Sequence, residues 1–239
     1  FKKGSNTLAA TEFGSFNTYS VHTSEVNGDG IPDLIYTYAG PAGAYVYEWL
    51  GQGYLSDTLK SVSSSPQNKL LVLLGSLVDP TIYTRDTTAR YPLVDLQVPL
   101  QVVRVTSQSN GLGGLNQVSY TYGGLKLEHA SAPGRGRGLL GFRWMRSKEQ
   151  ITGIETYSEF RQDWPYTGQM IKSETRLPGF GNGGLLKQTL YSHDCFLSNA
   201  ADTTTACASP APGKVYFAFQ GLSHEYSWVL NSALLPSIP

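Results

Sequence analysis

The sequence predicts an all-β protein made of serial antiparallel hairpins that form part of a large curved sheet. Three observations lead to this prediction. Short runs of β-branched and aromatic residues recur, glycine-rich turns separate them, and no stretch sustains the 3.6-residue period of an amphipathic helix. The 239 residues include 26 Gly and 15 Tyr, and only 15% are charged, against about 25% in an average soluble domain. This length suits one large all-β domain or two smaller units.

The N-terminal part predicts a pair of strands followed by a linker. "IPDLIYTY" (31–38) and "AYVYEWL" (44–50) read as antiparallel strands, because "AGPAG" between them is turn-forming. Residues 57–68 are polar and are expected to be a linker. "KLLVLLGSLV" (69–78) then predicts a buried strand, and the alternative of a helix is weakened by the glycine within the run. We therefore expect units at 1–56 and 69–239.

From residue 93 onward the sequence predicts a meander of antiparallel strands. The run "LQVPLQVVRVTSQ" is followed by the turn "NGLGG" and then by "LNQVSYTYGGLKLE". The same strand–turn–strand pattern recurs in "GFRWMRSKEQ" with "IETYSEFRQ", and in "QMIKSETRL" with "LLKQTLYSH". "KVYFAFQGLSHEYSWVL" supplies the final strand signal. A long antiparallel sheet follows from this order.

Charge and hydropathy exclude two classes of partner. Eighteen basic and 18 acidic residues cancel, whereas a nucleic-acid footprint needs surplus positive charge. The longest apolar run, "LLVLLGSLV", is far shorter than the ~20 residues of a spanning helix. We expect no nucleic acid and no membrane span. Both ends read as cuts in a longer polypeptide, so any export signal is expected upstream of this stretch.

The stretch "EVNGDGIPD" is a candidate metal loop. Glu25, Asn27, Asp29 and Asp33 fall at alternate positions, and a glycine bends the loop between the last two. Ca²⁺ takes six to eight oxygen ligands, and a bent loop of alternate carboxylates supplies them, with the Ile31 carbonyl and waters completing the sphere. The alternative is a structural turn.

The two cysteines predict a local disulfide. Cys195 and Cys207 enclose a short loop of small and polar residues, which suits a bridge in an oxidising compartment. Two free thiols in a reduced compartment are the alternative. His193 and Asp194 stand beside Cys195, but a nucleophile needs a base and an activated thiolate in space, and a bridged cysteine has no thiolate. We predict no catalytic residues.

Two arginine-containing motifs favour structural roles. In "GRGRGLLGFRW" (134–144) the glycines permit a tight crossing, and the arginines are expected to pair with acids such as Glu128 or Asp163. In "FRQDWPYTG" (160–168) we expect an ion pair between Arg161 and Asp163, with Trp164 and Tyr166 packed below it. A carbohydrate-binding aromatic pair is the alternative.

The run "NGDGIPDLIYT" followed by "VYEWLGQGY" resembles one blade unit of the FG-GAP or VCBS type. The family's metal pattern is D-x-[DN]-x-D-G-x-x-D, and "EVNGDGIPD" departs from it only at Glu25. One extra methylene makes this side chain reach differently, which puts that ligand in doubt. The resemblance implies a β-propeller blade fragment at 1–56 and a Ca²⁺ site.

A longer stretch, about residues 68–230, resembles the middle region of bacterial Rhs/YD-repeat proteins and of the B component of insecticidal toxin complexes. The resemblance rests on the order of "ARYPLVDLQVPLQVVRVTSQSNGLGG", "YTYGGLKLE", "GRGLLGFRWM", "TGIETYSEFRQDWPYTG" and "CASPAPGKVYFAFQ". The Y-D-x-x-G-R repeat itself does not occur. The resemblance implies a secreted or cell-surface bacterial protein whose sheet winds into a shell around a toxic C-terminal segment. This stretch would be a non-catalytic part of that shell, with other segments of the polypeptide and the toxin as partners. The alternative is a calcium-dependent adhesin or glycan-binding module.

Overall fold

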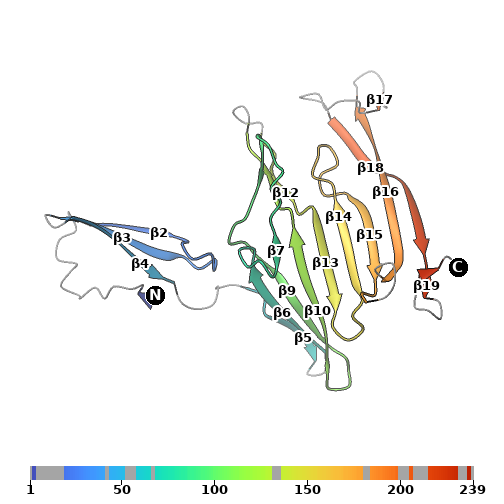
Figure 1. Cartoon of the computed structure of the whole chain (residues 1–239), viewed down its shortest axis with the longest axis horizontal. Coiled ribbons are helices and arrows are strands. Elements are labelled where there is room, and N and C mark those ends of the chain that lie inside the picture. The colour runs from blue at the N-terminus through green and yellow to red at the C-terminus, as the bar shows by residue number, and fades with distance from the viewer. Residues whose placement is uncertain are drawn as a thin grey trace.

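The computed structural model describes residues 2–3, 19–40, 43–51, 58–65, 68–130, 136–179, 184–198, 205–206, 215–230 and 236–237. These residues form strands and turns without any α-helix, which confirms the all-β prediction. Every strand pair is antiparallel except the short pair between β7 and β10. Figure 1 shows a small sheet to one side of a much larger, twisted one.

The small sheet contains the two strands that the N-terminal sequence predicts. Its order is β1-β4-β3-β2, a meander of neighbours with the N-terminal β1 added at the β4 edge. Tyr36 is buried in it and lies against Tyr47 on the adjacent strand, with ring centroids 5.8 Å apart. The strands are β1 (Lys2–Lys3), β2 (Tyr19–Ser24), β3 (Asp33–Gly40) and β4 (Gly43–Leu50).

The large sheet has eleven strands in the order β17-β16-β15-β14-β13-β10-β9-β6-β5, with β18 on β16 and β7 on β10. All three predicted hairpins are present, as β9–β10, β13–β14 and β15–β16. Its strands are β5 (Ser61–Ser65), β6 (Asn68–Ser76), β7 (Tyr83–Thr84), β9 (Gln101–Ser109), β10 (Leu115–Gly123), β13 (Trp144–Glu149), β14 (Glu155–Phe160), β15 (Met170–Arg176), β16 (Leu185–Ser198), β17 (Thr205–Ala206) and β18 (Val215–Ser227).

Two smaller sheets complete the described strands. One is three-stranded, in the order β12-β11-β8, and the other pairs β19 with β20. Their bounds are β8 (Leu93–Asp95), β11 (Lys126–Glu128), β12 (Gly138–Gly141), β19 (Val229–Leu230) and β20 (Pro236–Ser237).

One strand lies where the sequence predicts a linker. Residues 61–65, "SVSSS", form β5 and pair with β6. Every residue of β5 is exposed, so the strand carries no apolar alternation that would reveal it. It forms because β6 offers a free edge beside it.

The hydrophobic core is small and lies where β7 meets β10. Leu77, Ile82, Tyr83, Tyr122 and Leu125 are all at least 95% buried there. The Tyr83 hydroxyl donates to the Leu96 carbonyl at 2.6 Å and accepts the Leu125 N–H at 2.9 Å, so its polar atom is satisfied inside the core. Beyond this core most side chains of the large sheet are half-exposed or exposed, and Ser107, Glu174, Thr189 and Cys195 are buried.

Candidate functional site

The predicted metal loop connects β2 to β3 and is closed by its own side chains. The carboxylate of Glu25 accepts the N–H of Gly28 at 2.6 Å and of Asp29 at 3.1 Å. Asp29 in turn accepts the N–H of Ile31 at 2.7 Å, and Asn27 donates its amide to Asp29 at 2.9 Å. The bond from Ile31 to Asp29 is of the Asx-turn type, Glu25 makes further local side-chain to backbone bonds, and the Asn27–Asp29 bond joins two side chains.

Asp33, the last predicted ligand, is fully buried at the start of β3. Its two oxygens accept the N–H of Val26 at 2.8 Å and of Gly51 at 2.7 Å. Burial raises the pKa of this carboxyl, but the backbone N–H groups of Val26, Gly51 and Asn27 outweigh it and hold the pKa below its ordinary value. As a carboxylate, Asp33 therefore connects the loop after β2 to the residue that follows β4.

The structure places Glu25, Asn27, Asp29 and Ile31 in the loop between β2 and β3, and Asp33 at the first residue of β3. Within the described residues, which include this loop, no three acidic, histidine or cysteine side chains are arranged to hold a metal ion. The acids are turned toward backbone N–H groups instead of toward a common point. Calcium binding stays a prediction.

The same loop contacts the large sheet, which the sequence did not predict. Ser76 at the end of β6 donates to the Gly28 carbonyl at 2.9 Å, and Gln101 at the start of β9 donates to the Asp29 carbonyl at 3.0 Å. Gly28 has a φ of 81°, and a Cβ there would lie 2.8 Å from a Val78 methyl. A glycine is thus required both by the backbone and by the contact. The loop is a joint between the two sheets.

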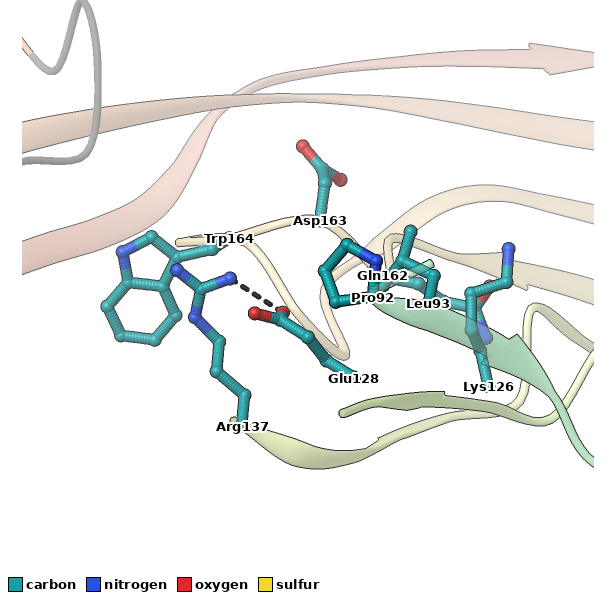
Figure 2. Close-up of a pocket in the computed structure, with 8 residues that line it drawn as sticks. All are labelled: Pro92, Leu93, Lys126, Glu128, Arg137, Gln162, Asp163 and Trp164. Atoms are coloured by element: carbon teal, nitrogen blue, oxygen red, sulfur yellow. Dashed lines mark hydrogen bonds and ion pairs between the residues drawn. The ribbon is translucent and has the colours of Figure 1, made fainter. Parts of the chain in front are cut away.

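An open cleft of about 570 Å³ lies between the three-stranded sheet and the turn after β14. Figure 2 shows Pro92 and Leu93 between Trp164 at one end of the cleft and Lys126 at the other. Arg137 pairs with Glu128 at 2.7 Å, as its motif predicted, and its guanidinium lies 5.0 Å from the Trp164 ring centroid. The cleft therefore has apolar residues in its middle, an aromatic residue at one end and the paired charges of Arg137 and Glu128.

The turn "FRQDWPYTG" contains the predicted ion pair. Arg161 donates to both oxygens of Asp163, with Nε 2.8 Å from Oδ1, and this bonding holds the pKa of Asp163 below its ordinary value. The Arg161 guanidinium covers the Tyr166 ring at 3.8 Å. Trp164 differs from the packing expected of it: it is 40% exposed and meets Tyr216 edge-on at 5.8 Å. It lies there because the turn projects its side chain toward Tyr216 of β18 and the guanidinium of Arg137.

One face of strands β13 to β15 carries a ladder of ion pairs. Lys172 lies between Glu159 at 3.5 Å and Glu174 at 3.6 Å, and Arg176 also pairs with Glu174 at 2.9 Å. Burial raises the pKa of Glu174, but hydrogen bonds from Arg176 and Gln188 and the charge of Lys172 outweigh it and lower the pKa. Glu174 is held ionised by its neighbours, which is a structural pattern and not that of a general acid.

Arg143 anchors the end of this ladder. It holds Asp86 through two bonds of 2.7 and 2.9 Å, and its Nη1 lies 3.6 Å from Glu159. The hydrogen bond from Arg143 lowers the pKa of Asp86. Asp86 is 57 residues away in sequence, and the sequence analysis missed this pair.

The His193–Cys195 segment lies in β16, with His193 and Cys195 on one face as strand alternation requires. Burial and the charge of Arg161 lower the pKa of His193, whose ring lies 6.1 Å from that of Tyr166. Cys195 is 4% exposed and is disulfide-bonded. Cys207, its predicted partner, lies outside the described residues.

The fold and its clefts define a class: an open, single-layer antiparallel β-sheet protein with a small appended sheet. No protein-family model matches the chain, and no curated protein matches it. No helix among the described residues is long and apolar enough to cross a membrane.

Proposed function

We propose that this chain is a non-catalytic wall segment of a secreted or cell-surface Rhs-type or toxin-complex protein. One observation carries the proposal: the large sheet extends over eleven strands in a single layer, without pairing of its outermost strands to each other among the described residues. A sheet with open edges suits a part that continues into neighbouring segments of a longer polypeptide. An encapsulated toxic segment is the further partner in this proposal.

The state of the ionisable groups supports a non-catalytic role. Glu128 is paired with Arg137, Asp163 with Arg161, and Glu174 with Arg176. The pairing lowers the pKa of Asp163 and of Glu174, so both are kept in their charged form by a fixed neighbour. A general acid or base requires instead a pKa near the working pH and a free site for a substrate proton.

The coding sequence on either side of this chain tests the proposal. We expect propeller-type blades upstream and Y-D-x-x-G-R repeats with a variable tail downstream. A wall-anchor signal, or a downstream region without such repeats, would contradict it.

The calcium site is part of the proposal. Three carboxylates in one glycine-bent loop are the chemistry that Ca²⁺ prefers, and the side chains that now accept N–H groups retain further lone pairs. Calorimetric titration of metal-free protein should give binding heat that Asp29→Ala removes. Absence of heat at millimolar Ca²⁺ would leave the loop a purely hydrogen-bonded joint.

A glycan-binding surface module is the second candidate. The cleft in Figure 2 favours it, because Trp164 is 40% exposed beside hydrogen-bonding side chains, and sugar rings stack on exposed aromatics. Glycan-array binding that Trp164→Ala abolishes and Trp144→Ala preserves would support this candidate. Lack of binding by the wild-type chain would remove it.

A further inference from the structure

The two outer edges of the large sheet differ in length and chemistry. β5 at one end has only five residues, "SVSSS". β18 at the other end has 13 residues and pairs with β16 along one side. Among the described residues no strand lies along the other side of β18. The backbone donors and acceptors of that side are a template for another strand.

An aromatic cluster lies at this edge. Phe217 and Phe219 follow each other on one face of β18, with ring centroids 5.5 Å apart, and Phe219 also stacks on Phe196 of β16 at 5.3 Å. Phe217 is 66% exposed. The stretch 217–221, "FAFQG", contains no charge and no proline, the residues that usually protect a sheet edge. Exposed aromatics beside an open edge mark an interaction surface.

The stretch is complementary to itself in one antiparallel register. If a second copy pairs with its two-fold axis at Ala218, Phe217 of each copy lies directly opposite Phe219 of the other, and the small Ala218 meets its own counterpart on the opposite face. Aromatic residues directly opposite each other are among the stabilising cross-strand pairs. A register centred on Gly221 would instead place Phe217 opposite Glu225.

We propose that two copies of this chain associate through the outer edges of β18, in the register centred on Ala218, to form one continuous sheet. Such an interface uses the same surface of both copies and is closed after two. Because β5 is short and polar, the opposite edge of the sheet does not extend the assembly. The product is a dimer and not a filament.

This inference is independent of the proposed wall function. In a longer polypeptide a neighbouring strand would compete for the same edge, so self-association belongs to the chain with this edge free. A monomeric chain would leave the wall proposal standing, and a dimer would not establish it.

Sedimentation equilibrium over a wide concentration range tests the proposal. We expect a monomer–dimer equilibrium in the wild type and at least a tenfold increase of the dissociation constant in Phe217→Lys. Val46→Lys, a change at a 71% exposed position of β4 in the small sheet, is the matched control and should leave the constant unchanged. A wild type that stays monomeric, a dimer that Phe217→Lys does not weaken, or growth beyond two copies overturns the proposal.

A charge swap tests the register. In Phe217→Lys/Phe219→Glu each lysine lies opposite a glutamate, so dimerisation should recover relative to Phe217→Lys, whereas Phe217→Lys/Phe219→Lys should stay monomeric. Equal behaviour of the two double variants would exclude the register.

Hydrogen exchange of the wild type needs no variant to fold: amides of 217–221 should be more protected at high than at low concentration, and those of 61–65 should not change. Equal protection of 217–221 at both concentrations overturns the proposal.

Discussion

Replacement of the buried Asp33 tests whether this residue, and not a metal ion, holds the small sheet together. Asp33→Ala removes the acceptor of two short backbone N–H bonds, those of Val26 and Gly51, at a site without solvent exposure. A hydrogen bond to a charged group contributes about 1.5–3 kcal/mol, and donors left unpaired in a buried site cost a similar amount. We therefore expect Asp33→Ala to lower the free energy of unfolding by about 3–5 kcal/mol. Asp29→Ala removes the side-chain acceptor of the Ile31 N–H and of the Asn27 amide, nearer the surface, and should cost about 1 kcal/mol.

Hydrogen exchange of residues 19–51 in the presence of a chelator is the assay, because it reports the opening of this sheet separately from the large one. The wild type should also lose protection in acid. The pKa of Asp33 is below its ordinary value in the folded state, so its contribution is present above the unfolded pKa, about 3.9, and disappears as the pH falls through the folded pKa. Equal costs for Asp33→Ala and Asp29→Ala, or a cost for Asp33→Ala below about 1 kcal/mol, would refute the reasoning.

Three further predictions concern the large sheet. Gly123→Ala should destabilise by about 1–3 kcal/mol in urea unfolding, because a Cβ there would lie 2.2 Å from the Trp144 ring, and an unchanged midpoint would contradict the packing. Asp86→Asn should destabilise at neutral pH and lose its effect in acid, because the hydrogen bond from Arg143 lowers the pKa of Asp86; a difference from wild type that stays constant as the pH falls through the folded pKa would exclude this origin. Maleimide labelling of denatured, unreduced protein should leave Cys195 unmodified, and a reactive thiol would contradict its disulfide.

The hairpins could be predicted from sequence because their signals are local. Runs of β-branched and aromatic residues bounded by glycine turns, such as "NGLGG" between β9 and β10, specify both strands and the loop that joins them. β5 escaped prediction for the opposite reason. Its polar residues carry no period, and it pairs only because β6 lies beside it.

The joint between the sheets could not be predicted for a different reason. The metal-type pattern drew attention to the right loop, yet the contacts of Ser76 and Gln101 with that loop span 48 and 72 residues. The pattern also does not reveal whether a carboxylate faces a cation or a backbone N–H. Asp33 fits both descriptions in sequence, and only its burial against Val26 and Gly51 separates them.

Cryo-electron microscopy of the polypeptide encoded by the complete open reading frame tests the central proposal most directly. We expect the edges of β5 and β18 to continue into neighbouring strands of the same chain, so that this sheet is one section of a closed wall around an internal C-terminal segment. A free-standing domain whose edges stay unpaired by the rest of the chain, with a ligand in the Trp164 cleft, would contradict the account.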